Sequence, residues 1–309
     1  MKAAKKEYSQ HETRMKNKSR KRLVGRPPFL TERDCRILNY LWRWKVASTA
    51  SVHEMINRPS SAYSTYKTLF RLEGSGFITS LSDYAGNFSV WTLTKQGFSI
   101  VKSKLSELSD DSFSSDNLEH DRLVQAFHLG EWATHQFPIV EFFTRQEIQR
   151  IDTSDYPDWV PKSKEHQPDG YTKVTGAKVT RLFAFEVELF SRRDSKYESI
   201  LQFYKHARSI NRVYWLIDSE QTKEQILKAK ASVMDESFNY HVFVDLADFK
   251  KNGWEAFVVN EKSEKVHTIR ENMQEICGDI YSELIAKAQG KSMVNVHLNH
   301  LKVIGKSKG

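Results

Sequence analysis

The strongest constraint on this chain is a pattern of acidic residues between positions 166 and 188. Asp169 stands between a proline and a glycine, and a polar turn at Thr175-Gly176-Ala177 separates it from a strand-like run that contains Glu186 and Glu188. Because side chains alternate along a strand, Glu186 and Glu188 are predicted to point to one face. A hairpin about the turn would bring Asp169 beside Glu186 if the strand register allows it.

Three carboxylates at the end of a sheet suit a hard divalent cation such as Mg²⁺ or Mn²⁺. The layout resembles the PD-(D/E)XK nuclease superfamily, whose two motif acids hold the metal and whose lysine polarises the attacking water. The resemblance makes Asp169, Glu186 and Glu188 the candidate catalytic and metal-binding residues, with Glu188 at the lysine position. It implies an α/β domain of restriction-endonuclease-like type with a mixed sheet. The missing lysine argues against cleavage.

A lysine on the helix after the acidic strand is the candidate replacement. In some nuclease-like families the motif lysine has moved to such a helix, and Lys205 lies in the helix predicted over 194–209. A surface lysine on an amphipathic helix is the more common alternative. His120 and His128, on the helix predicted over 119–136, are expected to have structural roles.

The positive charge lies in the first third of the chain. Residues 1–30 carry ten lysines and arginines against two glutamates, and residues 31–105 carry ten against five acids. The whole chain has a net charge of +8, so residues 106–309 are net negative, at −5. This distribution indicates nucleic-acid binding by the first third. A solvated, disordered basic arm over 1–29 is compatible with it.

Within that arm, Gly25-Arg26-Pro27 resembles the core of an AT-hook, which lies extended in a narrow A·T minor groove. Arg26 would enter the groove, and the proline would keep the chain extended. Val24 stands where that motif carries an arginine, and a plain basic linker is the alternative.

Residues 30–105 are predicted to form a winged helix-turn-helix. Three helices follow from apolar spacing and from capping residues at Thr31, Ser48 and Ser60-Ser61. A hairpin over 77–93 and a fourth helix complete the pattern, and the close of the hairpin resembles that of many winged-helix regulators.

The third of these helices is the predicted recognition helix, with Tyr63, Ser64, Lys67 and Arg71 as DNA-binding candidates. Tyr63, Lys67 and Arg71 are spaced to share a face. Lysine and arginine there can contact phosphates or guanine in the major groove. A tyrosine buried in the core and a protein-binding role for the domain are the alternatives.

The remaining chain divides by composition. Residues 106–118 are rich in serine and aspartate and are predicted to be a linker. Residues 119–262 alternate helices and strands, which favours a mixed α/β sheet, with 212–217 as its buried central strand. Residues 263–309 are predicted to be a C-terminal helix and tail.

The combination resembles one family more narrowly. A winged helix followed by Pro168-Asp169-Gly170, a strand with paired acids and a helix ending near Tyr204-Lys205 is similar to the replication-relaxation family of plasmids and other mobile elements. The resemblance covers about residues 30–245 and implies binding of double-stranded DNA in replication, relaxation, mobilisation or transcription control. Two functions stay open: a DNA-binding protein with a degenerate nuclease-like domain, and a Mg²⁺-dependent endonuclease targeted by its winged helix.

Location and assembly are less constrained. No apolar run is long enough to span a membrane, and the two cysteines, Cys35 and Cys277, fit a reducing compartment. The sequence therefore predicts a cytoplasmic protein without a membrane partner, and a homodimer stays open.

Overall fold

The computed structural model describes residues 29–57, 61–82, 89–130, 140–175, 180–233 and 241–278. Two compact units divide them, the first made of 29–42 and 46–105 and the second of 43–45 and 106–278. Predicted features outside these ranges are the basic arm through residue 28, with Arg26, and the tail beyond residue 278. None of the helices in the described ranges is both long and apolar enough to span a membrane.

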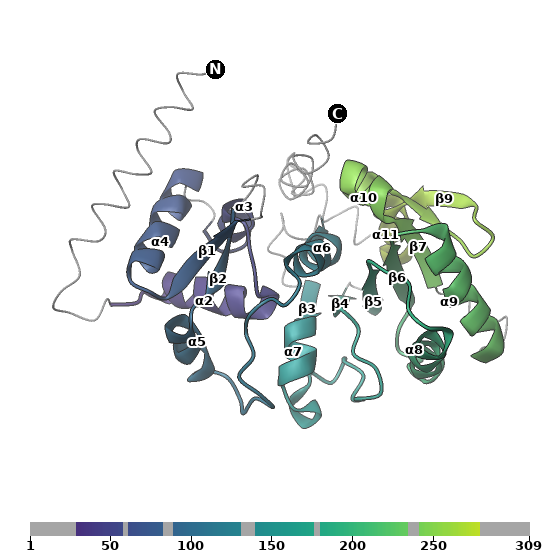
Figure 1. The fold of residues 1–309 in the computed structure, drawn as a ribbon, viewed down its shortest axis with the longest axis horizontal. Coiled ribbons are helices and arrows are strands. Elements are labelled where there is room, and N and C mark those ends of the chain that lie inside the picture. The colour runs from purple at the N-terminus through teal and green to yellow at the C-terminus, as the bar shows by residue number, and fades with distance from the viewer. Residues whose placement is uncertain are drawn as a thin grey trace, which may run out of the picture. The chain divides into compact units, whose positions relative to one another are not determined.

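The first unit has a helix, a short helix, a third helix, a hairpin and a fourth helix in that order (Figure 1). These are α2 (Glu32–Trp44), α3 (Thr49–Val52) with a π-helical continuation (His53–Asn57), α4 (Ala62–Gly74), β1 (Ile78–Ser82), β2 (Ser89–Leu93) and α5 (Lys95–Lys102). Ser48 and Ser61 each accept an amide hydrogen bond in the first turn of the following helix, as their capping role predicts. Ala47 pairs with Trp91 through backbone hydrogen bonds of 3.0 and 2.8 Å, which adds a third extended segment to the hairpin.

The second unit is built on a seven-stranded mixed sheet, as the alternation of elements predicts. Its elements are α6 (Leu118–Leu129), β3 (Val140–Thr144), α7 (Arg145–Arg150), a 3₁₀ turn (Thr153–Asp155), β4 (Gly170–Thr175), β5 (Thr180–Glu188), α8 (Asp194–His206), β6 (Arg212–Ile217), α9 (Glu220–Val233), β7 (His241–Asp245), α10 (Leu246–Asn252), a second 3₁₀ turn (Gly253–Glu255), β8 (Phe257–Val259), β9 (Lys265–Thr268) and α11 (Ile269–Cys277). The strands lie side by side in chain order. β5, β6 and β7 run parallel, and the other neighbouring pairs are antiparallel.

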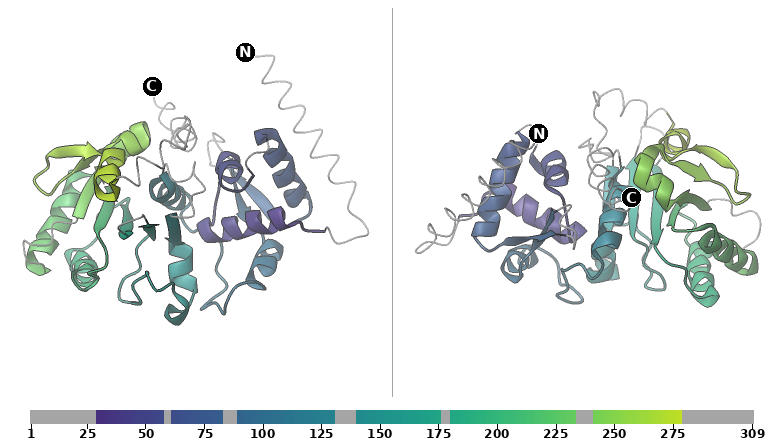
Figure 2. Two further views of the ribbon diagram at one scale, coloured as in Figure 1. Left: turned by 180° about the vertical axis from the view of Figure 1, so that it is seen from behind. Right: turned by 45° about the horizontal axis from the view of Figure 1, so that its top comes forward.

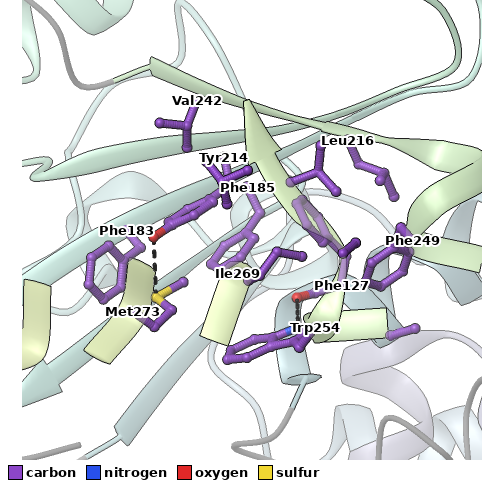
Figure 3. Packing of buried hydrophobic residues seen from close by; sticks show 14 of the residues in the cluster. Phe127, Phe183, Phe185, Tyr214, Leu216, Val242, Phe249, Trp254, Ile269 and Met273 are labelled. Atoms are coloured by element: carbon purple, nitrogen blue, oxygen red, sulfur yellow. Dashed lines mark hydrogen bonds between the residues drawn. The ribbon is translucent and has the colours of Figure 1, made fainter. Parts of the chain in front are cut away.

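Helices cover both faces of this sheet, so each face has its own hydrophobic core. One core joins alternate residues of β5, β6 and β7 to α6, α10 and α11, and the other joins the intervening residues to α7, α8 and α9. Figures 1 and 2 show α8 and α9 on the opposite side of the sheet from α10 and α11. In the first core Phe127 meets Phe185 edge to face, and Phe185 stacks on Tyr214 (Figure 3).

Two segments differ from expectation in their boundaries. The helix predicted over 119–136 ends at Leu129, because Gly130 adopts a positive φ of 43° beneath the ring of Trp254. Any side chain at Gly130 would collide with that ring, since its Cβ would lie 1.7 Å from the indole. The segment predicted as a linker is held against α7, where the Ser109 amide donates to the Arg150 carbonyl at 2.8 Å.

Candidate functional site

Strand register brings the predicted acids together at one end of the sheet. Gly170 pairs with Phe185 across the β4–β5 hairpin, and the Asp169 amide donates to the Phe185 carbonyl at 2.9 Å. The Val187 amide donates in turn to Asp169 Oδ2 at 2.8 Å. Asp169 is therefore fixed beside the end of β5 that carries Glu186 and Glu188, as the hairpin predicts.

Close packing against His128 explains why a glycine follows Asp169. A Cβ at Gly170 would lie 2.3 Å from Cε1 of His128, so a larger residue would displace that ring. His128 is completely buried, and its Nε2 donates to the Tyr171 carbonyl at 3.0 Å. Burial lowers the pKa of His128 to about 3, so the imidazole is neutral. This is the structural role that the sequence predicts for His128.

Asp169 is paired with two cations. Arg145, the first residue of α7, donates from Nη1 to Asp169 Oδ1, and Nε2 of His120 lies 3.5 Å from Asp169 Oδ2. Burial alone would raise the pKa of Asp169, but the charge of Arg145 and the contact with His120 outweigh it and hold the pKa well below its usual range. Asp169 is thus an ionised carboxylate in a buried ion pair.

His120 is the second of these cations. Its Nδ1 lies 3.7 Å from Asp121 Oδ1, so the ring stands between two carboxylates. Burial would lower the pKa of His120, but Asp121 and Asp169 together raise it to about 9. An imidazolium and a guanidinium therefore supply two positive charges at Asp169 at neutral pH.

Glu186 is buried between two hydrogen-bonding side chains. Its Oε1 accepts from His166 Nε2 and from the Tyr204 hydroxyl, both at 2.5 Å. Tyr204 reaches it from α8, which covers this face of the sheet. Burial, with the nearby charge of Glu186, raises the pKa of Tyr204 well above its usual value, so the phenol stays a donor.

Glu188 is also buried. Its Oε2 accepts from Arg192 Nε at 2.7 Å, and its Oε1 has no hydrogen-bond partner within the described ranges. Burial raises the pKa of Glu188 to about 8. The positive charge of Arg192 lowers this pKa, whereas the negative charges of Glu186 and Asp169 raise it further. At neutral pH this carboxyl is therefore mainly protonated.

With these partners, the three acidic side chains do not fit a divalent cation. Across the described residues, no three histidine, cysteine, aspartate or glutamate side chains are arranged to hold a metal ion. Asp169 and Glu186 already accept hydrogen bonds from charged or hydroxyl donors, and Glu188 holds a proton. A metal would have to displace Arg145 and His120 and remove that proton. Metal ligation by the three acids stays a prediction.

The structure places Lys205 elsewhere. Its ammonium donates to the Val233 carbonyl at the end of α9, at 2.8 Å. Sequence reasoning missed Arg145, Arg192 and His166 as members of the acidic cluster. The capping box of Thr144 and Glu147 signals that α7 begins at Arg145, directly after β3, but it does not signal the contact with Asp169.

The predicted recognition helix α4 exposes the face that its spacing indicates. Tyr63 is 53% exposed, and Lys67 lies over its ring with Nζ 4.5 Å from the centroid. Arg71 is exposed as well, and it donates to the completely buried carboxylate of Asp34 on α2. Ser64 is half-buried in the first turn, where its amide donates to the capping Ser61 hydroxyl. Arg71 therefore ties α4 to α2 besides being available at the surface.

Comparison with protein-family models and with curated proteins gives no match. Among solved structures, the chain is similar to the restriction endonuclease FokI bound to DNA, with a TM-score of 0.26, 10% identity and coverage of 70% of this chain. A second structure of the restriction endonuclease FokI gives a TM-score of 0.23, 9% identity and the same coverage. The chain spans 43% and 42% of those two chains. Similarity at this level does not establish a shared fold.

Proposed function

We propose that this protein binds double-stranded DNA through a winged helix-turn-helix over residues 30–105. The observation that carries the proposal is the exposed face of α4, where Tyr63, Lys67 and Arg71 project from the third helix of the unit. The positive charge of this part of the chain supports a polyanionic partner. The Ala47 bridge to Trp91 supports the winged form, because it fastens the connection before α3 to the hairpin.

The second unit is proposed to be a degenerate PD-(D/E)XK domain over residues 119–262. The order α6, β3, α7, β4, β5, α8, β6 and the acids Asp169 and Glu186 at the end of the hairpin support this assignment. The buried, partnered state of those acids and the glutamate at position 188 favour binding over cutting. A role in replication, relaxation, mobilisation or transcription control of a plasmid or other mobile element is proposed from the resemblance of the sequence to the replication-relaxation family.

Binding is tested with full-length protein and a fluorescent duplex at several salt concentrations. Lys67→Ala should cost about 1–3 kcal/mol if the lysine contacts a base, and should lower the salt slope by about one if it contacts a phosphate. The matched control is Lys95→Ala, which removes an exposed lysine from α5. Equal binding by wild type and Lys67→Ala would exclude α4 as the DNA contact.

Cleavage is tested separately on supercoiled plasmid with Mg²⁺ or Mn²⁺. The plasmid should stay intact, because Asp169 and Glu186 are already bound by other side chains and Lys205 donates to the Val233 carbonyl. Nicking by the wild type that Asp169→Asn abolishes would instead establish the endonuclease, and Lys205 would be the next residue to substitute.

A further inference from the structure

Two arginines at the acidic end of the sheet are each held by a buried acidic side chain. Arg145 is bound by Asp169, and Arg192 is bound by Glu188. Both acidic side chains are almost completely buried, whereas the arginine side chains are 31% and 37% exposed. Each arginine side chain is therefore fixed by one ion pair and still partly exposed to solvent.

The open edges still have hydrogen-bond donors. A guanidinium has five N–H groups. Counting only described residues, Arg145 uses Nη1, towards Asp169, and Arg192 uses Nε, towards Glu188. Nε and Nη2 of Arg145 and both terminal nitrogens of Arg192 remain for a ligand. Because the buried partners already fix these side chains, binding a ligand would cost less rotamer entropy than binding by free arginines.

Both arginines are held at the same end of β5, because Asp169, which binds Arg145, accepts from the Val187 amide, and Glu188, which binds Arg192, is the next residue. The charge of Asp169 is the main cause that raises the pKa of Arg145, and Glu186 contributes. Burial opposes a raised pKa for Arg192, but Glu188, Glu186 and Asp169 outweigh it. Both guanidiniums thus lie within range of the same two buried acids. Phosphate matches this setting, because planar guanidiniums bind its oxygens through paired hydrogen bonds.

An exposed aromatic side chain follows the same strand end. Phe190 stands two residues beyond Glu188 and is 75% exposed, and Arg193 and Lys196 in the next turn are exposed too. Cations that follow a backbone, combined with an aromatic platform for bases, are the composition of sites that bind single strands. A paired base is stacked inside a duplex and cannot use such a platform.

We infer that the acidic end of the second unit binds a single nucleic-acid strand, with Arg145 and Arg192 on its backbone phosphates and Phe190 stacked on an unpaired base. The arginines take the position between carboxylate and phosphate that a divalent cation has in a cutting enzyme. That the ligand is a nucleic acid rests on the proposed function. The inference adds a second site, for a single nucleic-acid strand, that does not use α4.

The test uses full-length protein and a fluorescent oligothymidylate of about 12 nucleotides, within the span of known single-strand sites. Arg192→Gln and the paired change Arg145→Gln with Asp169→Asn, which avoids an unpaired buried charge, should each weaken binding. Each should also lower the salt slope by about 0.7 for every phosphate that the variant no longer neutralises. Phe190→Ala should weaken binding about tenfold and leave the salt slope unchanged, because stacking releases no counterions.

The control is Lys162→Gln, which removes an exposed lysine beside Thr180 and Leu182, at the other end of β5. Circular dichroism and melting temperature establish that each variant is folded. Wild-type affinity and slope in both arginine variants, once folded, would overturn the inference. Duplex binding is measured in parallel to separate the two proposals. If Lys67→Ala loses duplex binding while the arginine variants bind the single strand as well as the wild type does, only the single-strand site is rejected. Absence of duplex binding by the wild type rejects the proposed function instead.

Discussion

Replacing Glu188 with glutamine should make the protein progressively more stable than the wild type as the pH rises. The carboxyl has a pKa of about 8 in the folded protein, against 4.5 in the unfolded chain, chiefly because it is buried. At a pH between these two pKa values, the folded state therefore holds a proton that the unfolded state has released. Unfolding becomes easier by about 1.4 kcal/mol for each pH unit in that window, or about 5 kcal/mol in all, because a tenfold difference in proton affinity is worth that much.

Glutamine does not titrate, so the variant loses this pH dependence. The variant also loses the ion pair with Arg192. This loss lowers its free energy of unfolding mainly at a pH high enough to ionise Glu188 in the wild type. Urea unfolding at pH 5.5, 6.5 and 7.5 should show the free-energy difference between variant and wild type moving by about 2–3 kcal/mol in favour of glutamine. Glu198→Gln, which changes an exposed glutamate on α8, is the control. A difference that stays constant with pH would show that Glu188 is ionised throughout, and the argument from its burial would be refuted.

Three further outcomes follow from the same contacts. Gly170→Ala should lower the free energy of unfolding by about 1–3 kcal/mol, because its Cβ would press on His128; unchanged urea unfolding would contradict this. Arg71→Ala should lower the melting temperature, because the buried Asp34 carboxylate loses its ion-pair partner, and an equal melting temperature would remove that structural role. Mn²⁺ should not raise the melting temperature of the wild type, since the acids are already partnered; a rise that Asp169→Asn abolishes would restore the metal site.

The fold follows the sequence where periodicity and capping agree. The predicted caps at Ser48 and Ser61, the buried strand 212–217 and the hairpin ending in paired acids are all present. These features depend on local chemistry, namely side-chain oxygens that satisfy free amides and alternation that selects one sheet face. The short strands β8 and β9 were not predicted, because three or four residues give too little periodicity to recognise.

The candidate site was predictable only in its acids. Asp169, Glu186 and Glu188 are recognisable from spacing, because register and alternation are properties of neighbouring strands. Arg145 and His120 reach Asp169 from α7 and α6, and no local pattern records that approach. Their effect is on charge: the spacing of the acids suggests a cation site, whereas the assembled site already contains its cations.

That difference determines what would have to change before these acids could bind a metal ion. Glu188→Lys supplies the lysine of the PD-(D/E)XK pattern that the sequence resembles, but the new ammonium would face Arg192 and join Arg145 and His120 near one ionised aspartate. The surplus positive charge would repel a divalent cation further, so Glu188→Lys alone should leave supercoiled plasmid intact with Mg²⁺. Adding Arg145→Ala and His120→Ala removes both competitors for Asp169 and should permit Mn²⁺ to raise the melting temperature of the triple variant. Plasmid cleavage by Glu188→Lys alone would show that the arginine and the imidazole do not block the site.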